Sequence, residues 1–246
     1  MAPIQHLCLL FAMREEADSL IKSLKLTSSG QLKKPYPMQL YQGQQNNVQL
    51  SVVLAGVDQR FAVDYVGTEP ATLMASVALD ILQPDLLITA GTAGGFKRHT
   101  NNIGDIVISA DTFVYHDHHV PLSGLHDSAL GHYPAVDASR LCSDLGFFPG
   151  IISSGSSLAK NATDIEAMGL FDARAKDMEA AAIAWVAMLH QVPCMAVKAI
   201  TNLVDEDNRS EDEFLANFNI AATSLTTALL DIIVYVQDKT IADLAH

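Results

Sequence analysis

Short apolar runs alternate with helical patterns along most of the chain, and this alternation limits the fold more than any other feature of the sequence. Gly, Pro or polar residues bound each apolar run, as they bound buried strands. The runs cover about residues 5–12, 48–55, 85–90, 104–110, 150–154 and 193–201. Helical patterns lie between them at about 14–25, 62–82, 137–145, 161–170, 177–190 and 211–237. Strands that alternate with helices predict an α/β fold with parallel pairing in the centre of its sheet.

The chain is expected to form one domain over residues 1–246. Its 246 residues are 49% apolar and 17% charged, which is enough to bury a substantial core and is typical of a soluble globular protein. No internal repeat or low-complexity linker divides it. The polar stretch 27–37 and the His-rich segment 116–134 are expected to be excursions from the core, and loops of this size usually gate sites or form interfaces.

The charge of the chain restricts its partners. A net charge of −13, with only 15 Lys and Arg in total, disfavours nucleic acid and anionic membrane surfaces, because both require basic patches. A small molecule is therefore the expected partner. The first residues contain no basic region, and their apolar run ends at Arg14, too early for a signal peptide or a membrane span. We expect this run to be a buried first strand.

The cysteines indicate the compartment. Cys8, Cys142 and Cys194 are odd in number, have no CxxC spacing and lie in apolar surroundings. We expect them to be reduced packing residues, which predicts a cytoplasmic location.

A Met-Glu pair and a later polar cluster are the most informative functional features. Glu179 opens a small-residue helix, and its carboxylate could accept hydrogen bonds from two vicinal ribose hydroxyls. Thr201, Asn202 and Asp205 follow a buried strand, at the sheet edge where α/β proteins bind ligands. This layout favours a nucleoside site. The structural alternative is a buried ion pair between Glu179 and Lys198.

Two further segments could contribute to such a site. Glu16 lies in the first turn of the first predicted helix, where a glutamate ordinarily complements the helix dipole but could also deprotonate a water. The turn Thr89–Phe96 carries Gly91, Gly94 and Gly95 but matches neither a P-loop nor a GxGxxG pattern. It is either a plain tight turn or a place where the backbone and Thr92 approach a sugar or base.

The segment His116–His119 has the composition of a metal site. Alternation along an extended segment would place His116 and His118 on one face and Asp117 and His119 on the other, so three ligands would not converge easily. We expect no metal and no other cofactor.

Six ordered motifs give the chain a resemblance over nearly its whole length. They are FAMREEAD at 11–18, ITAGTAGGFK at 88–97, NIGDIVIS at 102–109, SGSSL at 154–158, KDMEAAAIAWVA at 176–187 and VKAITNLVDED at 197–207. On these motifs the chain resembles the 5′-methylthioadenosine/S-adenosylhomocysteine nucleosidases of the purine nucleoside phosphorylase superfamily, and is most similar to their plant type. The resemblance implies a three-layer α/β sandwich with a mixed, partly barrel-like sheet. It also implies a homodimer in which the neighbouring subunit helps to line the site.

The resemblance assigns roles to individual residues. Glu16 would activate water, Glu179 would bind the ribose hydroxyls, and Met178 would pack on the sugar. Further matching positions are Met13 in the first motif, Thr92, Ala93 and Gly94 beside the sugar and base, Leu158 and Ala159 over the purine, and Lys198 near the attacking water. Glu16 also favours hydrolysis over phosphorolysis, because two unit charges 4 Å apart repel by about 4 kcal/mol at an effective dielectric constant of 20. Water carries no charge and tolerates the carboxylate.

Asn202 is the one departure from the family pattern that affects the chemistry. The nucleosidases carry an aspartic acid there, which protonates N7 of the departing adenine, whereas an amide can donate a hydrogen bond but transfers no proton. Loss of a general acid commonly costs about 10² to 10⁴ in rate. Three interpretations stay open: an inactivated variant, a change of preference toward 6-oxopurine nucleosides in a hydrolase or phosphorylase, or a non-catalytic protein that binds purine nucleosides.

The expected activity is hydrolysis of the N-glycosidic bond of 5′-methylthioadenosine, with S-adenosylhomocysteine as a second substrate to test, in methionine salvage. The products would be adenine and a thioribose. Trp185, Val186, Met188 and the loop 116–120 could form the interface of a homodimer or belong to the core, and helical periodicity does not distinguish the two.

Overall fold

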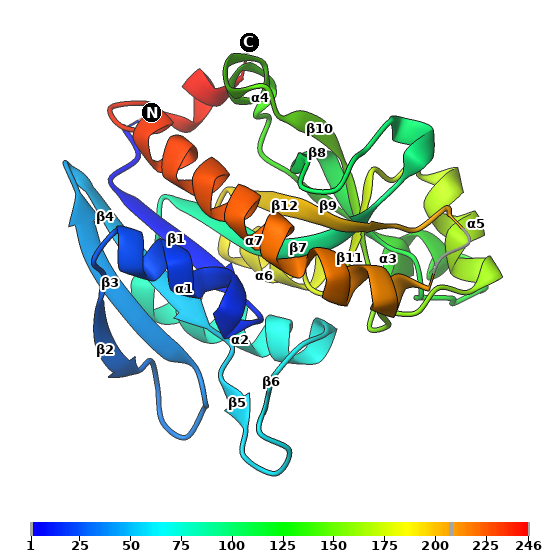
Figure 1. Cartoon of the computed structure of the whole chain (residues 1–246), viewed down its shortest axis with the longest axis horizontal. Helices are drawn as coiled ribbons and strands as arrows, with labels where there is room; N and C mark the ends of the chain where they lie inside the picture. The colour runs from blue at the N-terminus through cyan, green and yellow to red at the C-terminus, as the bar shows by residue number, and fades with distance from the viewer. Residues whose placement is uncertain (1, 207–208, 246) are drawn as a thin grey trace.

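The computed structural model describes residues 2–206 and 209–245 and contains one large mixed sheet covered by helices (Figure 1). Asp207, the last residue of the final motif, lies outside the described residues. In spatial order the sheet contains β11 (Ala175–Asp177), β10 (Phe148–Ser154), β8 (Ile106–Tyr115), β12 (Cys194–Leu203), β7 (Leu86–Gly95), β1 (His6–Phe11), β4 (Val48–Leu54), β3 (Gln39–Gln45) and β2 (Thr27–Gln31), and β9 (Gly131–Pro134) pairs with β8. The helices are α1 (Arg14–Ser23), α2 (Thr68–Leu82), α3 (His126–Leu130), α4 (Ser139–Leu145), α5 (Ala162–Leu170), α6 (Ala180–His190) and α7 (Ser210–Tyr235), with short 3-10 turns η1 (Lys97–His99) and η2 (Ile241–Leu244).

The sheet closes partly on itself. Strands β12, β7, β1 and β4 are parallel, which confirms the predicted parallel centre, and β12 pairs antiparallel with β8. The short strand β11 pairs parallel with β10 and also antiparallel with β7. The path from β11 through β10, β8, β12 and β7 therefore returns to β11. This is the mixed, partly barrel-like sheet that the resemblance implied.

Two hydrophobic cores lie on opposite faces of the sheet. Alternation along β1 sends Leu7, Leu9 and Phe11 to one face, where they pack with α1, α4 and α7, and sends Cys8 and Leu10 to the other, where they pack with α2 and α6. Helix, sheet and helix thus form the three expected layers (Figure 1).

Helix α7 is long and apolar enough to cross a membrane by length and composition alone. Its side chains Leu225, Leu229 and Ile232 are fully buried in the first core, and it runs across the sheet over β12 (Figure 1). Its hydrophobicity is therefore explained by its place in the core.

The six predicted strands and six predicted helices are present, with corrections at their ends. The helix predicted at 62–82 begins at Thr68, because Val63–Asp64 forms β6, which pairs with β5 (Val57–Asp58). The helix predicted at 177–190 begins at Ala180, because Asp177 belongs to β11.

The excursion predicted at 27–37 is partly wrong, because its first half is a strand. Strand β2 pairs antiparallel with β3 at the edge of the sheet, and neither was predicted. Their sequences, TSSGQ and QLYQGQQ, are polar because much of this edge faces solvent, so no apolar run marks it. The segment 116–134 does contain a long loop, followed by α3 and β9.

Candidate active site

A cavity of about 560 Å³ opens at the carboxyl ends of the central parallel strands. It is lined by the end of β1 and the start of α1, by Thr89–Gly94 of β7, by Lys176–Glu179 and by residues of β12, and α7 contributes Phe214. Parallel strands present their carboxyl ends at one edge of a sheet, so residues far apart in sequence meet there. The residues to which the resemblance assigned a role all line this cavity except Ala159. Asp205 of the predicted polar cluster does not line it either, and its carboxylate instead accepts hydrogen bonds from the backbone N–H groups of Lys97 and Arg98.

Glu16 is buried at the start of α1, at 4% exposure. Its Oε1 accepts hydrogen bonds from the backbone N–H and the hydroxyl of Thr92, both at 2.7 Å. Gly91 makes room for the carboxylate, because a Cβ on Gly91 would come within 3.1 Å of Glu16 Oε2. Burial raises the pKa of Glu16, although the hydrogen bonds from Thr92 oppose this shift. The glutamate thus lies inside the cavity and does more than complement a helix dipole.

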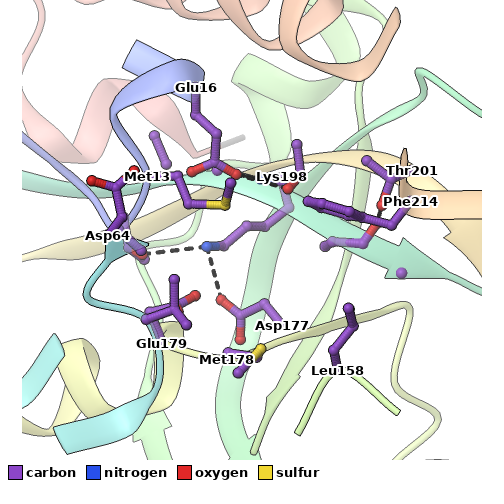
Figure 2. Close-up of a pocket in the computed structure, with 18 of the residues that line it drawn as sticks. Met13, Glu16, Asp64, Leu158, Asp177, Met178, Glu179, Lys198, Thr201 and Phe214 are labelled. Atoms are coloured by element: carbon purple, nitrogen blue, oxygen red, sulfur yellow. Dashed lines mark hydrogen bonds and ion pairs between the residues drawn. The ribbon is translucent and has the colours of Figure 1, made fainter. Parts of the chain in front are cut away.

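Lys198 forms a fully buried ion pair with Asp177. Its Nζ lies 2.8 Å from Asp177 Oδ2, and both side chains are at most 2% exposed. Figure 2 shows the ammonium between the carboxylates of Glu16 and Asp177. Burial lowers the pKa of Lys198, but the charges of Asp177 and Glu179 outweigh burial and raise it.

The structural alternative, an ion pair between Glu179 and Lys198, is therefore wrong. The partner of Lys198 is Asp177, two residues earlier, which the sequence analysis did not consider. Asp177 also accepts hydrogen bonds from the Ser154 hydroxyl and from the backbone N–H of Ala180. The position of Asp177 directly before the Met-Glu pair could have identified it as a site residue. It was missed because the helix was predicted to begin at residue 177.

Glu179 occupies the N-cap position of α6 and borders the cavity. Its Oε1 accepts a hydrogen bond of 2.9 Å from the backbone N–H of Gly67. Burial, followed by the nearby charge of Asp177, raises the pKa of Glu179 to about 7. Met13 and Met178 also line the cavity, Met13 near Glu16 and Met178 near Asp177 (Figure 2).

Asn202 lines the cavity near the end of β12. It is 2% exposed, and its Oδ1 accepts a hydrogen bond of 2.9 Å from the Thr201 hydroxyl. Its Nδ2 lies beside Gly94, where a Cβ would come within 3.1 Å of it. With the carbonyl held by Thr201, the amide N–H group is the part of Asn202 that can donate to a ligand.

Leu158 lines the cavity, but Ala159 does not. The carbonyl of Ala159 accepts a hydrogen bond of 2.9 Å from Lys176 Nζ, and so does that of Leu158. The side chain of Lys176 therefore holds the loop that carries both residues. Sequence reasoning missed Lys176, and it also missed Asp64 and Phe214, all of which line the cavity.

The segment His116–His119 is not an extended strand, so the predicted alternation of its side chains is wrong. His116 is buried against the Ser153 hydroxyl at 3.0 Å, whereas His118 is partly exposed and stacks on Tyr115. Within residues 2–206 and 209–245, no three His, Cys, Asp or Glu side chains form a group that could hold a metal ion.

Comparisons with known proteins agree with this geometry. The sequence profile of the Phosphorylase superfamily matches residues 6–234. The chain is 34% identical over 244 residues to a 5′-methylthioadenosine nucleosidase from Arabidopsis thaliana, covering 98% of this chain and 91% of that protein. It is 32% identical over 246 residues to a 5′-methylthioadenosine/S-adenosylhomocysteine nucleosidase from the same plant, covering 98% and 96%. The solved apo structure of the Arabidopsis thaliana 5′-methylthioadenosine nucleosidase superposes with a TM-score of 0.94 at 33% identity, covering 98% of this chain and 99% of that chain.

The raised pKa of Glu179 predicts a pH-dependent effect of Glu179→Gln on stability. The folded protein holds a proton that the unfolded chain releases between pH 4.5 and about 7, so stability falls as pH rises through this window. Glutamine removes this cost and keeps the acceptor for Gly67. We expect thermal unfolding at about pH 8 to show a gain of at most about 3 kcal/mol that is largely lost near pH 4.5. Glu166→Gln, at an exposed position on α5, is the control, and an equal gain at both pH values would contradict the account.

Proposed function

The chain belongs to the phosphorylase superfamily, and on that basis we propose that it hydrolyses the N-glycosidic bond of 5′-methylthioadenosine. The products are adenine and methylthioribose, which would enter methionine salvage. S-adenosylhomocysteine is the second substrate to test, since one of the two relatives is named for both compounds. The observation that carries the proposal is the buried Glu16, held by Thr92 at the cavity wall of a chain that matches two nucleosidases over nearly its full length.

The reaction needs charge stabilisation on both sides of the bond. As the bond to the purine lengthens, C1′ becomes cationic and the base becomes anionic, and a water must attack C1′ from the opposite face. The carboxylate of Glu16 accepts the proton of that water, and its negative charge stabilises the cationic sugar. Thr92 holds Glu16 by two hydrogen bonds, which leaves Oε2 for the water.

The charges around the sugar favour water over phosphate. Glu16, Asp177 and Glu179 surround the single ammonium of Lys198. When all three carboxylates are ionised, the group carries a net negative charge, which repels a phosphate ion but not a water molecule. Hydrolysis is therefore favoured over phosphorolysis.

The remaining residues position the nucleoside. Glu179 accepts the ribose hydroxyls, and the thioether side chains of Met13 and Met178 pack on the sugar. Ala93 and Gly94 let the backbone approach the base, and Leu158 covers it. This arrangement, together with the similarity to two nucleosidases, favours 5′-methylthioadenosine over the alternatives of a 6-oxopurine nucleoside enzyme or a binding protein.

Glu16→Gln tests the proposed role of the carboxylate. The variant keeps the shape of the side chain but accepts no proton, so we expect adenine release from 5′-methylthioadenosine to fall by about 10² to 10⁴. Chromatography of the reaction mixture measures the released base. The variant Glu166→Gln, at an exposed position on α5 that does not line the cavity, should retain activity within a few-fold. Equal activity of Glu16→Gln and the parent protein would exclude Glu16 as the base.

Asn202→Asp tests the departure from the family pattern. Asn202 lies where an acid would protonate N7, so the parent protein should bind 5′-methylthioadenosine and cleave it slowly. Restoring the acid should raise kcat by about 10² to 10⁴ with little change in binding. Steady-state kinetics of the two proteins measures this difference. An Asp variant that is no faster would mean that protonation of the base has another source or does not limit the rate.

We also infer a homodimer, which exposed apolar side chains on two adjacent helices support. On α6, Trp185, Met188 and Leu189 are 39%, 41% and 61% exposed and share one face, whereas Val186 belongs to the core. On α2, which packs beside α6, Leu73 and Ile81 are 39% and 45% exposed. Exposed apolar side chains that gather on neighbouring helices are typical of protein interfaces.

Light scattering tests the homodimer. We expect the parent protein to have the mass of two chains and Leu189→Asp to have that of one, because the new charge would be buried in the interface. Leu170→Asp, at an 81% exposed leucine on α5, is the matched control and should stay dimeric. A parent protein that is monomeric at micromolar concentration would contradict the inference.

A cytoplasmic location remains part of the proposal. Cys8, Cys142 and Cys194 are all buried free thiols, which is the state expected in a reducing compartment.

A further inference from the structure

Lys176 is a charged residue of the cavity that the mechanism above does not use. The cavity is lined by two lysines, of which Lys198 is paired with Asp177 on the sugar side. Asn202 leaves the base side without the acid that the family carries there. Lys176 is the remaining lysine of the cavity, which raises the question of what its charge does.

The strand register places Lys176 and Asn202 on either side of Gly94. In the sheet Lys176 pairs with Gly94 of β7, and Gly94 pairs with Asn202 of β12 on its other side. Residues paired across neighbouring strands direct their side chains to the same face. The lysine and the amide therefore flank a glycine, which adds no side chain between them. A Cβ on Gly94 would come within 2.6 Å of Val204 Cγ2 and 3.1 Å of Asn202 Nδ2, so the glycine is needed here.

The ammonium of Lys176 lies under the loop that covers the base. The residue is 6% exposed, and Nζ donates to the carbonyls of Leu158 and Ala159, each at 2.9 Å. These are its only hydrogen-bond acceptors among the described residues, and no described carboxylate forms an ion pair with it. One of its three N–H groups therefore remains available. Burial lowers its pKa most, and the carboxylates of Asp164 and Asp117 oppose this shift without forming an ion pair with it.

A buried ammonium without an ion-pair partner is costly. Desolvation of an ammonium that is compensated only by carbonyl dipoles disfavours its charged form, and burial accordingly lowers the pKa of Lys176. Closing the loop alone would not require a positive charge, since an apolar side chain or a neutral donor could also fill this space. The charge itself therefore calls for an explanation.

We propose that the ammonium of Lys176 stabilises the purine as it leaves as an anion. This inference rests on the proposed hydrolysis. When the C1′–N9 bond breaks, its electron pair stays on the purine, whose negative charge is shared between the Lys176 ammonium and the Asn202 amide. The water oxygen bonds to C1′ and passes its proton to Glu16. Solvent then protonates the purine, and Glu16 returns its proton to solvent, so the overall reaction consumes one water.

A comparison of leaving groups separates this role from loop positioning. The substrates are 5′-methylthioadenosine and its 6-chloropurine analogue, whose base is the more stable anion and leaves more easily. For Lys176→Met we expect kcat to fall by about 10²-fold or more with the adenine substrate, the size of effect seen when one charge-stabilising donor is removed. With the 6-chloropurine substrate the loss should be below about tenfold, because that base needs less stabilisation.

Two further variants serve as controls. Lys176→Arg keeps the charge and should keep the parent protein's dependence on the leaving group. Lys160→Met removes a lysine of the same loop that binds the carbonyls of Val204 and Glu206 and does not line the cavity. Any loss caused by Lys160→Met should be the same for both substrates. If Lys176→Met does not fold, Lys176→Gln replaces it, since glutamine is neutral but still donates to the two carbonyls.

Each outcome decides the inference. A larger loss for adenine than for 6-chloropurine, restored by arginine, supports it. Equal losses for both bases would reduce Lys176 to a positioning residue and overturn the inference while leaving the proposed hydrolysis intact. If the parent protein releases neither base, the proposed function fails and this inference fails with it.

Discussion

The buried ion pair between Lys198 and Asp177 holds together the elements that form the cavity. Lys198 comes from the centre of β12, and Asp177 from the short strand β11 that closes the sheet and leads into α6. The ammonium also offsets the charges of Glu16 on α1 and Glu179 at the start of α6. Without it, three carboxylates would be buried close together with no counter-charge, which would cost several kcal/mol. The geometry of the cavity therefore depends on one lysine.

In the proposed binding mode the cavity has a sugar side and a base side with different charges. Around the sugar, carboxylates outnumber the ammonium, which suits a cationic C1′ and a neutral nucleophile. Around the base, Asn202 and Lys176 offer N–H donors, which suit an anionic purine. As the N-glycosidic bond breaks, positive charge develops on C1′ and negative charge on the purine, so each charge faces side chains that stabilise it. Hydrolysis of a nucleoside thus follows from the distribution of charge as well as from similarity to known nucleosidases.

The sequence predicted the central architecture and most of the cavity, because both rest on strong local signals. The apolar runs marked the parallel strands, and the motifs that contain Glu16, Thr92 and Glu179 marked the strand ends where ligands bind. Asp177 was missed because β11 is only three residues long and carries no apolar run. The edge strands β2 and β3 were missed because their side chains are polar. The position of Lys176 across Gly94 from Asn202 depends on a long-range antiparallel pairing that no local pattern contains.

A crystal structure of Glu16→Gln with 5′-methylthioadenosine would test the central claim most directly, since the slow variant should hold the intact nucleoside. The account predicts the ribose hydroxyls on Glu179, a water between the substituted side chain and C1′, and the purine under Leu158 between Asn202 and Lys176. A nucleoside bound with its base beside Glu179, or its sugar beside Asn202, would contradict the assignment of the two sides of the cavity.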